Sequence, residues 1–226
     1  MVSARGIGCR GRRPMGDTVP LFDRLADAQR RCNVLEHPFY KRWSAGELTG
    51  EELSWYAGEY RHAVVALAEA TAATARAAEP AVRAQLVEHA AEEAEHIELW
   101  DAFARAVDAD LDQEAAAETA ECAAAWTAAG NALEGLVVLY AIESAQPAIS
   151  RTKLDGLVEH YGLAEGPATG YFSLHAERDH AHAAQSRGLI EDRLDSADED
   201  RLVAVAEAAL RGNWELLDGV ERHFGR

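Results

Sequence analysis

Residues 175–182, HAERDHAH, carry six titratable side chains in eight positions. If this segment is helical, each residue turns by about 100°, so His175, Asp179 and His182 share one stripe while His180 points away from it. Imidazole and carboxylate groups on one buried stripe are typical ligands of divalent transition metals. The pattern therefore predicts a metal-binding stripe at residues 175, 179 and 182, and a surface position for His180.

A second group of acids and histidines lies at residues 88–98, EHAAEEAEHIE. Glu93 and His96 have the ExxH spacing that carboxylate metal sites in helical bundles use. Glu92 and His89 precede His96 by four and seven residues, so they lie on nearly the same side of a helix. A run of glutamates is more often a solvent-exposed helix face, so this segment alone does not decide between a metal site and an exposed face.

Glu143 stands alone in an otherwise apolar stretch, LVVLYAIESAQP. A carboxylate that is buried without a partner is costly, so this residue indicates a specific role in the interior. Together, three predicted helices project a combined set of three carboxylates and three imidazoles. The set consists of Glu93, His96, Glu143, His175, Asp179 and His182.

Two divalent cations beside three carboxylates would leave a net charge of about +1 before hydroxide or substrate binds. This balance and ligand set favour a non-haem dinuclear iron or manganese centre. Zinc is less natural here, because zinc sites use fewer ligands and often thiolates.

The elements that would position these residues are all helical. Apolar residues recur with helical spacing from about residue 20 to the end, and no segment alternates with period two over a useful length. We expect an all-α bundle of about seven or eight helices in one domain. Thr49 and Glu52 form a capping box that starts a helix over about 50–78. Ser196 and Glu199 form a second.

Two further signals mark helix boundaries. Asn131 can cap a helix over residues that include Glu143, and Pro147 kinks or ends that helix. Pro80 stands where another helix can begin.

Composition excludes several classes of protein. The chain has 226 residues, a net charge of −17 and a pI near 4.9, which argues against nucleic-acid binding because that needs a basic surface. No apolar run approaches the roughly 20 residues of a membrane span. Cys9, Cys32 and Cys122 have neither disulfide nor zinc spacing, and a cytoplasmic location is the default expectation.

Residues 1–16 differ from the rest, since they are basic and rich in glycine and lack the apolar segment of a secretory signal. We expect a disordered tail here, or an upstream start codon with Met15 as the true first residue. The helical domain is then expected over residues 17–226.

Four segments carry a family likeness that covers about residues 33–193. The chain resembles the haem-oxygenase-like dimetal oxidases and oxygenases, and most closely the CADD-like 4-aminobenzoate synthases. The matching segments are LEHPFYKRWSAGELTGEELSWYAGEY, HIELWDAFARAV, LYAIESAQPAISRTKLDGLVEHYG and YFSLHAERDHAHA.

The resemblance implies an up-and-down bundle of about seven helices that binds two irons, or an iron and a manganese, and activates O2 with electrons from an external reductant. It implies that His96, Glu143, His175, Asp179 and His182 are ligands. The sixth ligand departs from the family pattern. CADD-like members have a glutamate where this sequence has His89, other members use the ExxH glutamate, here Glu93, and Glu92 also fits.

In CADD-like proteins the product ring is thought to come from the protein's own tyrosine, and the nitrogen from a lysine. The matching residues are Tyr40 as the ring source and Lys153 as the nitrogen donor, and Tyr56 matches a tyrosine that could relay an electron or radical. Judged without the resemblance, Tyr40 would simply pack at a helix junction and Lys153 would be solvated. The fold also implies a homodimer.

Three other functions stay open at this point. A dimetal oxygenase of the same architecture could act on a free amino acid, a fatty acid or an N-hydroxylated substrate. A metal-free member of the fold would resemble TenA thiaminases or pyrroloquinoline-quinone synthase, although none of the three cysteines matches a nucleophile motif. A binding module without activity would have no use for an inward stripe of acids and imidazoles.

Overall fold

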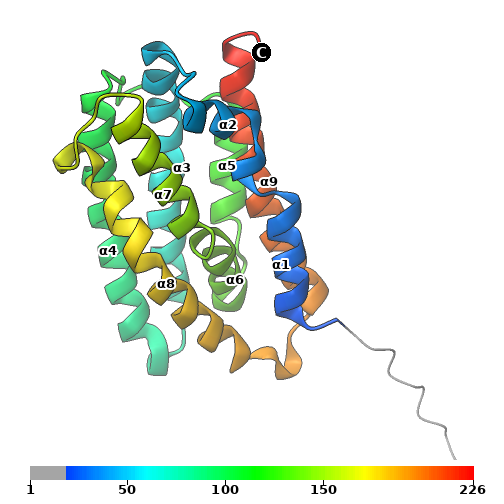
Figure 1. The fold of residues 1–226 in the computed structure, drawn as a ribbon. Helices are drawn as coiled ribbons and strands as arrows, with labels where there is room; N and C mark the ends of the chain where they lie inside the picture. The colour runs from blue at the N-terminus through cyan, green and yellow to red at the C-terminus, as the bar shows by residue number, and fades with distance from the viewer. Residues whose placement is uncertain (1–18) are drawn as a thin grey trace, which may run out of the picture.

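The computed structural model describes residues 19–226, and the expected tail over residues 1–16 lies outside this range. The described chain folds into a bundle of long helices joined by short connections (Figure 1). No strand occurs in residues 19–226. The predicted all-α class is confirmed.

Nine α-helices make up the bundle over the described range, together with three short 3-10 turns. The helices are α1 (Leu21–Arg31), α2 (Pro38–Ala45), α3 (Gly50–Ala77), α4 (Pro80–Ala106), α5 (Ala117–Thr127), α6 (Ala132–Glu143), α7 (Gln146–Glu159), α8 (Gly170–Glu191) and α9 (Glu199–His223). The turns are η1 (Val34–Glu36), η2 (Pro167–Thr169) and η3 (Leu194–Ser196).

Helix α3 is central to the packing, because it contacts α4, α5 and α6. On the other side of the bundle, α8 packs against α7, α6 and α4, and it runs obliquely across the molecule in Figure 1. Helix α9 packs against α1, α5 and α6. One continuous apolar core joins the helices, so α4, α6 and α8, which carry the predicted ligands, are held around a common interior.

Local sequence signals explain most helix boundaries. The Thr49 hydroxyl accepts from the Glu52 amide and the Glu52 carboxylate accepts from the Thr49 amide, so the predicted capping box is confirmed. The Asn131 side chain caps α6 by accepting from the Glu134 amide at 3.0 Å. Pro80 opens α4, where its missing N–H costs nothing.

The predicted capping box at Ser196 and Glu199 is wrong. The N-cap of α9 is Asp198, whose carboxylate accepts from the Arg201 amide at 3.1 Å. Residue 196 instead closes η3. Aspartate is as good an N-cap as serine, so the sequence DSADED offers two starting points, and the short turn before α9 selects the later one.

A two-residue joint separates α6 from α7. Helix α6 ends at Glu143 and α7 begins at Gln146, with Pro147 in the first turn of α7 rather than at the end of α6. Proline is tolerated in a first turn but not in a helix interior, so the helix must break before it. The joint places Glu143 and Gln146 on separate helices although only Ser144 and Ala145 lie between them.

No helix within residues 19–226 combines the length and the apolar character needed to cross a membrane.

Candidate metal centre

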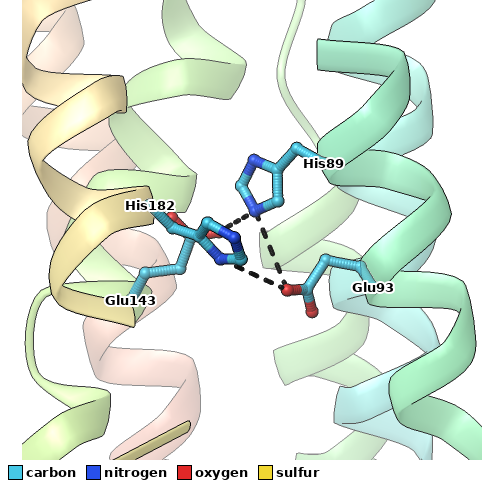
Figure 2. Close-up of side chains that lie close together, drawn as sticks. All are labelled: His89, Glu93, Glu143 and His182. Carbon is cyan, nitrogen blue, oxygen red and sulfur yellow. Dashed lines mark ion pairs between the residues drawn. The ribbon is translucent and has the colours of Figure 1, made fainter. Parts of the chain in front are cut away.

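Acids and imidazoles from α4, α6 and α8 meet in the interior between these helices. In Figure 2 the side chains of His89, Glu93, Glu143 and His182 point toward one another from three separate helices. We call these four residues the first cluster. Their potential ligand atoms all lie within 4.8 Å of one another, and all four residues are buried.

The shortest approach in the first cluster joins α4 to α6. His89 Nε2 lies 3.0 Å from Glu143 Oε1 and 3.7 Å from Glu93 Oε1. His182 Nδ1, from α8, lies 3.9 Å from the same Glu93 oxygen. The imidazole rings of His89 and His182 are 4.1 Å apart between centroids. Glu93 Oε1 therefore faces two imidazoles from different helices.

A second cluster shares Glu93 with the first. It consists of Glu93, His96 and His175, and its potential ligand atoms also lie within 4.8 Å of one another. His96 Nδ1 is 3.2 Å from Glu93 Oε1, and the rings of His96 and His175 are 4.5 Å apart between centroids. Glu93 is thus the one residue common to both clusters, so it would be available to an ion held by either.

Many buried side-chain atoms in these clusters and beside them lack a hydrogen-bond partner. The unpartnered atoms include both nitrogens of His89, both oxygens of Glu143, both oxygens of Asp179, Nδ1 of His96 and His182, and Nε2 of His175. Buried polar atoms in native proteins are nearly always paired. So many nitrogen and oxygen atoms without hydrogen-bond partners in one interior fit two divalent cations, and this donor set suits iron or manganese.

Without a cation, bound protons offset the negative charge of the buried carboxylates. Burial and the nearby carboxylates Glu143 and Glu93 raise the pKa of Asp179 to about 9. Burial opposes protonation of His89, but Glu143 and Glu93 outweigh it and raise its pKa to about 10. Burial and His96 lower the pKa of His175 to about 4. In the metal-free centre Asp179 is therefore protonated and His89 is an imidazolium. An incoming cation must displace these protons.

Asp179 lies outside both clusters, unlike the other five predicted ligands. It is 1% exposed, and its Oδ1 is 3.8 Å from His182 Nδ1 on the same helix. The structure thus buries the predicted stripe at residues 175, 179 and 182, and leaves His180 exposed.

The three alternatives for the sixth ligand separate in the structure. Glu93 belongs to both clusters, and His89 belongs to the first. Glu92 does not, because its Oε2 lies outside the cluster, 2.9 Å from His182 Nε2, and its other oxygen lies 3.4 Å from Arg178. Glu92 therefore contacts the outer nitrogen of a cluster histidine instead of entering the cluster.

Outer hydrogen bonds orient two of the histidines. The Nδ1 atom of His175 is 2.7 Å from the Tyr171 carbonyl oxygen, so Nδ1 carries the proton and Nε2 is free to bind a metal. His182 uses Nε2 toward Glu92 and turns Nδ1 inward. Such contacts commonly fix the tautomer and the ring orientation of metal-binding histidines.

A second buried group surrounds the Lys153 amine, and we call it the lysine chamber. The Nζ atom lies 4.3 Å from the Tyr60 ring centroid and 5.5 Å from the centroids of Tyr40 and Tyr56. Trp100, at 5.4 Å, and Phe172, at 5.7 Å, complete its walls. Lys153 is fully buried and Nζ has no hydrogen-bond partner, so the interpretation of Lys153 as a solvated residue is wrong.

The environment of Lys153 favours the uncharged amine. Burial lowers the pKa of Lys153 well below its usual 10.5. The amine has no hydrogen-bond partner, so attraction to the surrounding rings is the one favourable interaction described for an ammonium group here. A neutral amine keeps its lone pair and is a nucleophile.

Tyr40 and Tyr56 form a buried pair beside this amine. Their hydroxyl oxygens are 2.9 Å apart, and both rings are buried. Burial raises the pKa of each phenol well above 10, so both keep their protons at neutral pH. The structure therefore brings Tyr40, Tyr56 and Lys153, which lie far apart in the sequence, into one chamber.

Aromatic rings connect the lysine chamber to the second cluster. The Trp100 ring is 4.9 Å from the Tyr171 ring between centroids, and Tyr171 stacks on His175 at 4.0 Å. Trp100 also lies 5.0 Å from Tyr60. The two buried groups are thus neighbours within one interior.

Sequence reasoning missed Tyr60, Trp100 and Tyr171. Each lies four residues from a predicted residue, because Tyr60 follows Tyr56, Trp100 follows His96 and Tyr171 precedes His175. Residues four apart share a helix face. Extending each predicted stripe by one turn in both directions would have found all three.

Residues 54–214 match a family described as iron-containing redox enzymes. Two similar proteins are both named 4-aminobenzoate synthase. The protein from Chlamydia muridarum (strain MoPn / Nigg) is 30% identical over 213 residues, which cover 89% of this chain and 90% of the relative. The protein from Nitrosomonas europaea is 30% identical over 216 residues, which cover 85% of this chain and 87% of the relative.

Solved structures share the fold at lower sequence identity. A TenA homologue from P. horikoshii superposes with a TM-score of 0.74 at 20% identity and covers 90% of this chain and 99% of its own. A domain of unknown function with a haem-oxygenase-like fold from Shewanella denitrificans gives 0.78 at 20% identity, over 91% of this chain and 94% of its own.

Proposed function

This chain belongs to the haem-oxygenase-like family of iron-containing redox enzymes, and from that premise we propose that it is an O2-dependent dimetal 4-aminobenzoate synthase. In this proposal the ring comes from Tyr40 and the nitrogen from Lys153. The name shared by its relatives supports the product. The observation that carries the proposal is the lysine chamber, in which the buried Lys153 amine lies 5.5 Å from the Tyr40 ring centroid, near the candidate metal clusters.

The cluster residues divide the work of holding two ions. His89, Glu143 and His182 would hold one ion, and His96 and His175 the other, with Glu93 between them. Asp179 lies within 3.8 Å of His182 Nδ1 and has two unpaired oxygens, so a small side-chain rotation would bring it to the site. Two irons, or an iron and a manganese, would supply the binding and reduction of O2, with electrons from an external reductant.

The chain itself supplies position, dryness and protonation states. Apolar and aromatic walls exclude water from the chamber, which protects reactive species from side reactions. The pair formed by Tyr40 and Tyr56 provides a hydrogen bond through which a phenolic proton can leave as an electron is withdrawn. The lone pair of Lys153 stays available because no acid neutralises it.

The test is a reaction without added substrate. Protein loaded anaerobically with ferrous iron, then given a reductant and O2, should release at most about one 4-aminobenzoate per chain. The intact mass of the chain should change, and peptide mapping should place the changes at Tyr40 and Lys153. Tyr40→Phe and Lys153→Met should each abolish the product, whereas Tyr161→Phe, which alters a tyrosine outside the chamber, should not.

Two outcomes would contradict the proposal in different ways. Many turnovers by an unmodified chain would mean that the substrate is a free molecule and that the enzyme is an ordinary oxygenase of this fold. Equal product from Lys153→Met would mean that the nitrogen has another source, although the metal site would still stand.

The structure disfavours a metal-free thiol enzyme of the TenA type. Burial raises the pKa of Cys122 to about 12, so its thiolate is not available at neutral pH. Cys32 is half-buried and burial raises its pKa as well. Neither of these described cysteines belongs to the cluster or to the lysine chamber, and Cys9 lies outside the described residues.

A further inference from the structure

A cavity of about 300 Å³ lies between α1, α6, α7 and α9. This volume is at the lower end of the range for small-molecule sites, about 300–1,000 Å³. Apolar side chains such as Val34, Ile142, Ile149 and Leu210 form most of its wall. The clusters and the chamber described above do not include these residues, so the cavity is a separate feature.

One buried polar group lines this cavity without a full set of partners. Gln146 is 2% exposed, and its Oε1 has no hydrogen-bond partner. Its side chain is hydrogen-bonded to Tyr60, and this bond lowers the Tyr60 pKa, which burial raises. Tyr60 is the ring nearest to Lys153 Nζ. Gln146 therefore stands between the cavity and the lysine chamber and contacts both.

The same polar stripe continues along α7 to the amine. Gln146, Ser150 and Lys153 are spaced i, i+4 and i+7, so they share one face of the helix. All three are at most 2% exposed, and each has a polar atom without a partner: Oε1, Oγ and Nζ. Buried polar atoms are usually paired, so this row leaves unsatisfied polar atoms along one helix face, from the cavity at Gln146 to the amine of Lys153.

The outer end of the cavity carries hydrogen-bond donors. Arg30 is exposed and lines the cavity, although its guanidinium also contacts Asp27. Asn33 uses its Oδ1 to accept from the Leu35 amide, which leaves its NH2 group as a donor. In a chain with a net charge of −17, a cation and amides at a cavity mouth provide a local place for a carboxylate.

We propose that this cavity binds a small aromatic carboxylate that carries an amino group, and that it is the route by which such a product leaves the lysine chamber. The amino end would donate to Gln146 Oε1 and the carboxylate would face Arg30. The inference rests on the proposed function for the identity of the product. The existence of the binding site can be tested without any turnover.

The first experiment measures binding to metal-free protein by calorimetry, with 4-aminobenzoate, benzoate and aniline as probes. Arg30→Gln should weaken binding of 4-aminobenzoate and benzoate by about tenfold, the usual size of one lost charged contact, and leave aniline unchanged. Gln146→Leu should weaken 4-aminobenzoate and aniline and leave benzoate unchanged. Arg31→Gln is the matched control, because Arg31 pairs with Glu207 and does not line the cavity.

The second experiment measures release. Ile149→Trp fills the cavity from α7, and Val158→Trp is the control, because Val158 is on the same helix but 44% exposed. After a single turnover, product should remain with Ile149→Trp on a filtration membrane and appear in the filtrate only after acid denaturation. Wild type and Val158→Trp should release it without denaturation.

The outcomes separate this inference from the proposed function. Free release by a folded Ile149→Trp variant, or equal binding of all probes by wild type, Arg30→Gln and Gln146→Leu, would overturn the route and its site. If 4-aminobenzoate binds with the expected variant pattern and yet denatured wild type never yields product, the site stands and the proposed function falls. Circular dichroism of each variant shows whether it has folded.

Discussion

Two glutamates of this protein are buried to the same extent in very different surroundings. Glu59 and Glu143 are each 1% exposed. The Glu59 carboxylate accepts from the side chains of Gln113 and Thr119 and from the Ala116 amide, where it joins α3 to the start of α5. Both oxygens of Glu143 lack a hydrogen-bond partner and face imidazoles.

The difference shows that burial of an acid does not by itself indicate function. Glu59 accepts hydrogen bonds from the connection before α5 and from Thr119 within α5, so it contributes to folding. Glu143 makes no such set of hydrogen bonds, and in the metal-free fold its one close partner is the His89 imidazole at 3.0 Å. What distinguishes a functional acid here is the set of unsatisfied atoms around it, and a cation is the partner that would satisfy them all.

The sharpest way to break this comparison is to convert Glu143 to glutamine. Glu143→Gln should lower the affinity for the more weakly held metal by at least about 100-fold, beyond the effect of losing an outer contact. Metal-free stability should also fall, because the variant loses the buried ion pair with the His89 imidazolium. Metal analysis after dialysis and urea unfolding of the chelated protein check both parts. Full metal content in the variant would remove Glu143 from the centre.

The reciprocal change is Glu59→Gln, which should leave metal content unchanged and destabilise the fold. The new NH2 group would face donors in place of an acceptor, so we expect a loss of about 2 kcal/mol in the free energy of unfolding. Urea titration of wild type and variant measures it. A loss of metal in a fully stable Glu59→Gln variant would mean that the two acids are coupled.

The pH dependence of the metal-free protein sharpens the comparison further. The pKa of Asp179 is raised from 3.8 to about 9 in the folded chain, so folded protein keeps a proton that unfolded protein releases. Its contribution to stability is complete below about pH 4 and is lost as pH rises through 9. Relative to Asp179→Asn, wild type with chelator should therefore lose up to about 1.4 kcal/mol per pH unit in this window.

Metal binding should abolish that slope, because the ion replaces the proton. Urea titrations of both proteins at pH 6, 7 and 8, with and without manganese, give the comparison. If the free energy of unfolding changed with pH in the same way for both chelated proteins, Asp179 would not be protonated in the folded state.

The smallest expected effect concerns the outer contact of His182. Glu92→Gln should weaken metal binding by about tenfold, since the outer partners of metal-binding histidines contribute 10–100-fold, and Glu92 is only partly buried. Glu95→Gln is the control on the same helix, because Glu95 is exposed. Equal metal affinities for the two variants would make Glu92 a surface residue without influence on the centre.

Helix boundaries and inward stripes could be predicted from the sequence because both depend on local spacing. The 175/179/182 stripe, the Thr49 capping box and the isolated Glu143 all follow from residues within two turns of one another. The choice of Asp198 over residue 196 as N-cap could not be predicted, because both residues suit that position and the preceding turn decides between them.

The lysine chamber could not be read from local pattern. Tyr40, Tyr60 and Lys153 come from α2, α3 and α7, and their contact depends on how these helices pack. The same holds for His89, which only packing against Glu143 brings into the first cluster. Residue type alone also could not show that Lys153 is buried, since most lysines are exposed.

The joint of two residues between α6 and α7 fixes how the α7 side chains are rotated relative to those of α6. Glu143 is the last residue of α6 and Gln146 the first of α7. The direction in which Lys153 points from α7 therefore depends on the orientation of the last turn of α6. Inserting or deleting one residue at Ser144 or Ala145 would rotate that direction by about 100°. We therefore expect this joint to tolerate substitutions at Ser144 and Ala145 far better than insertions or deletions.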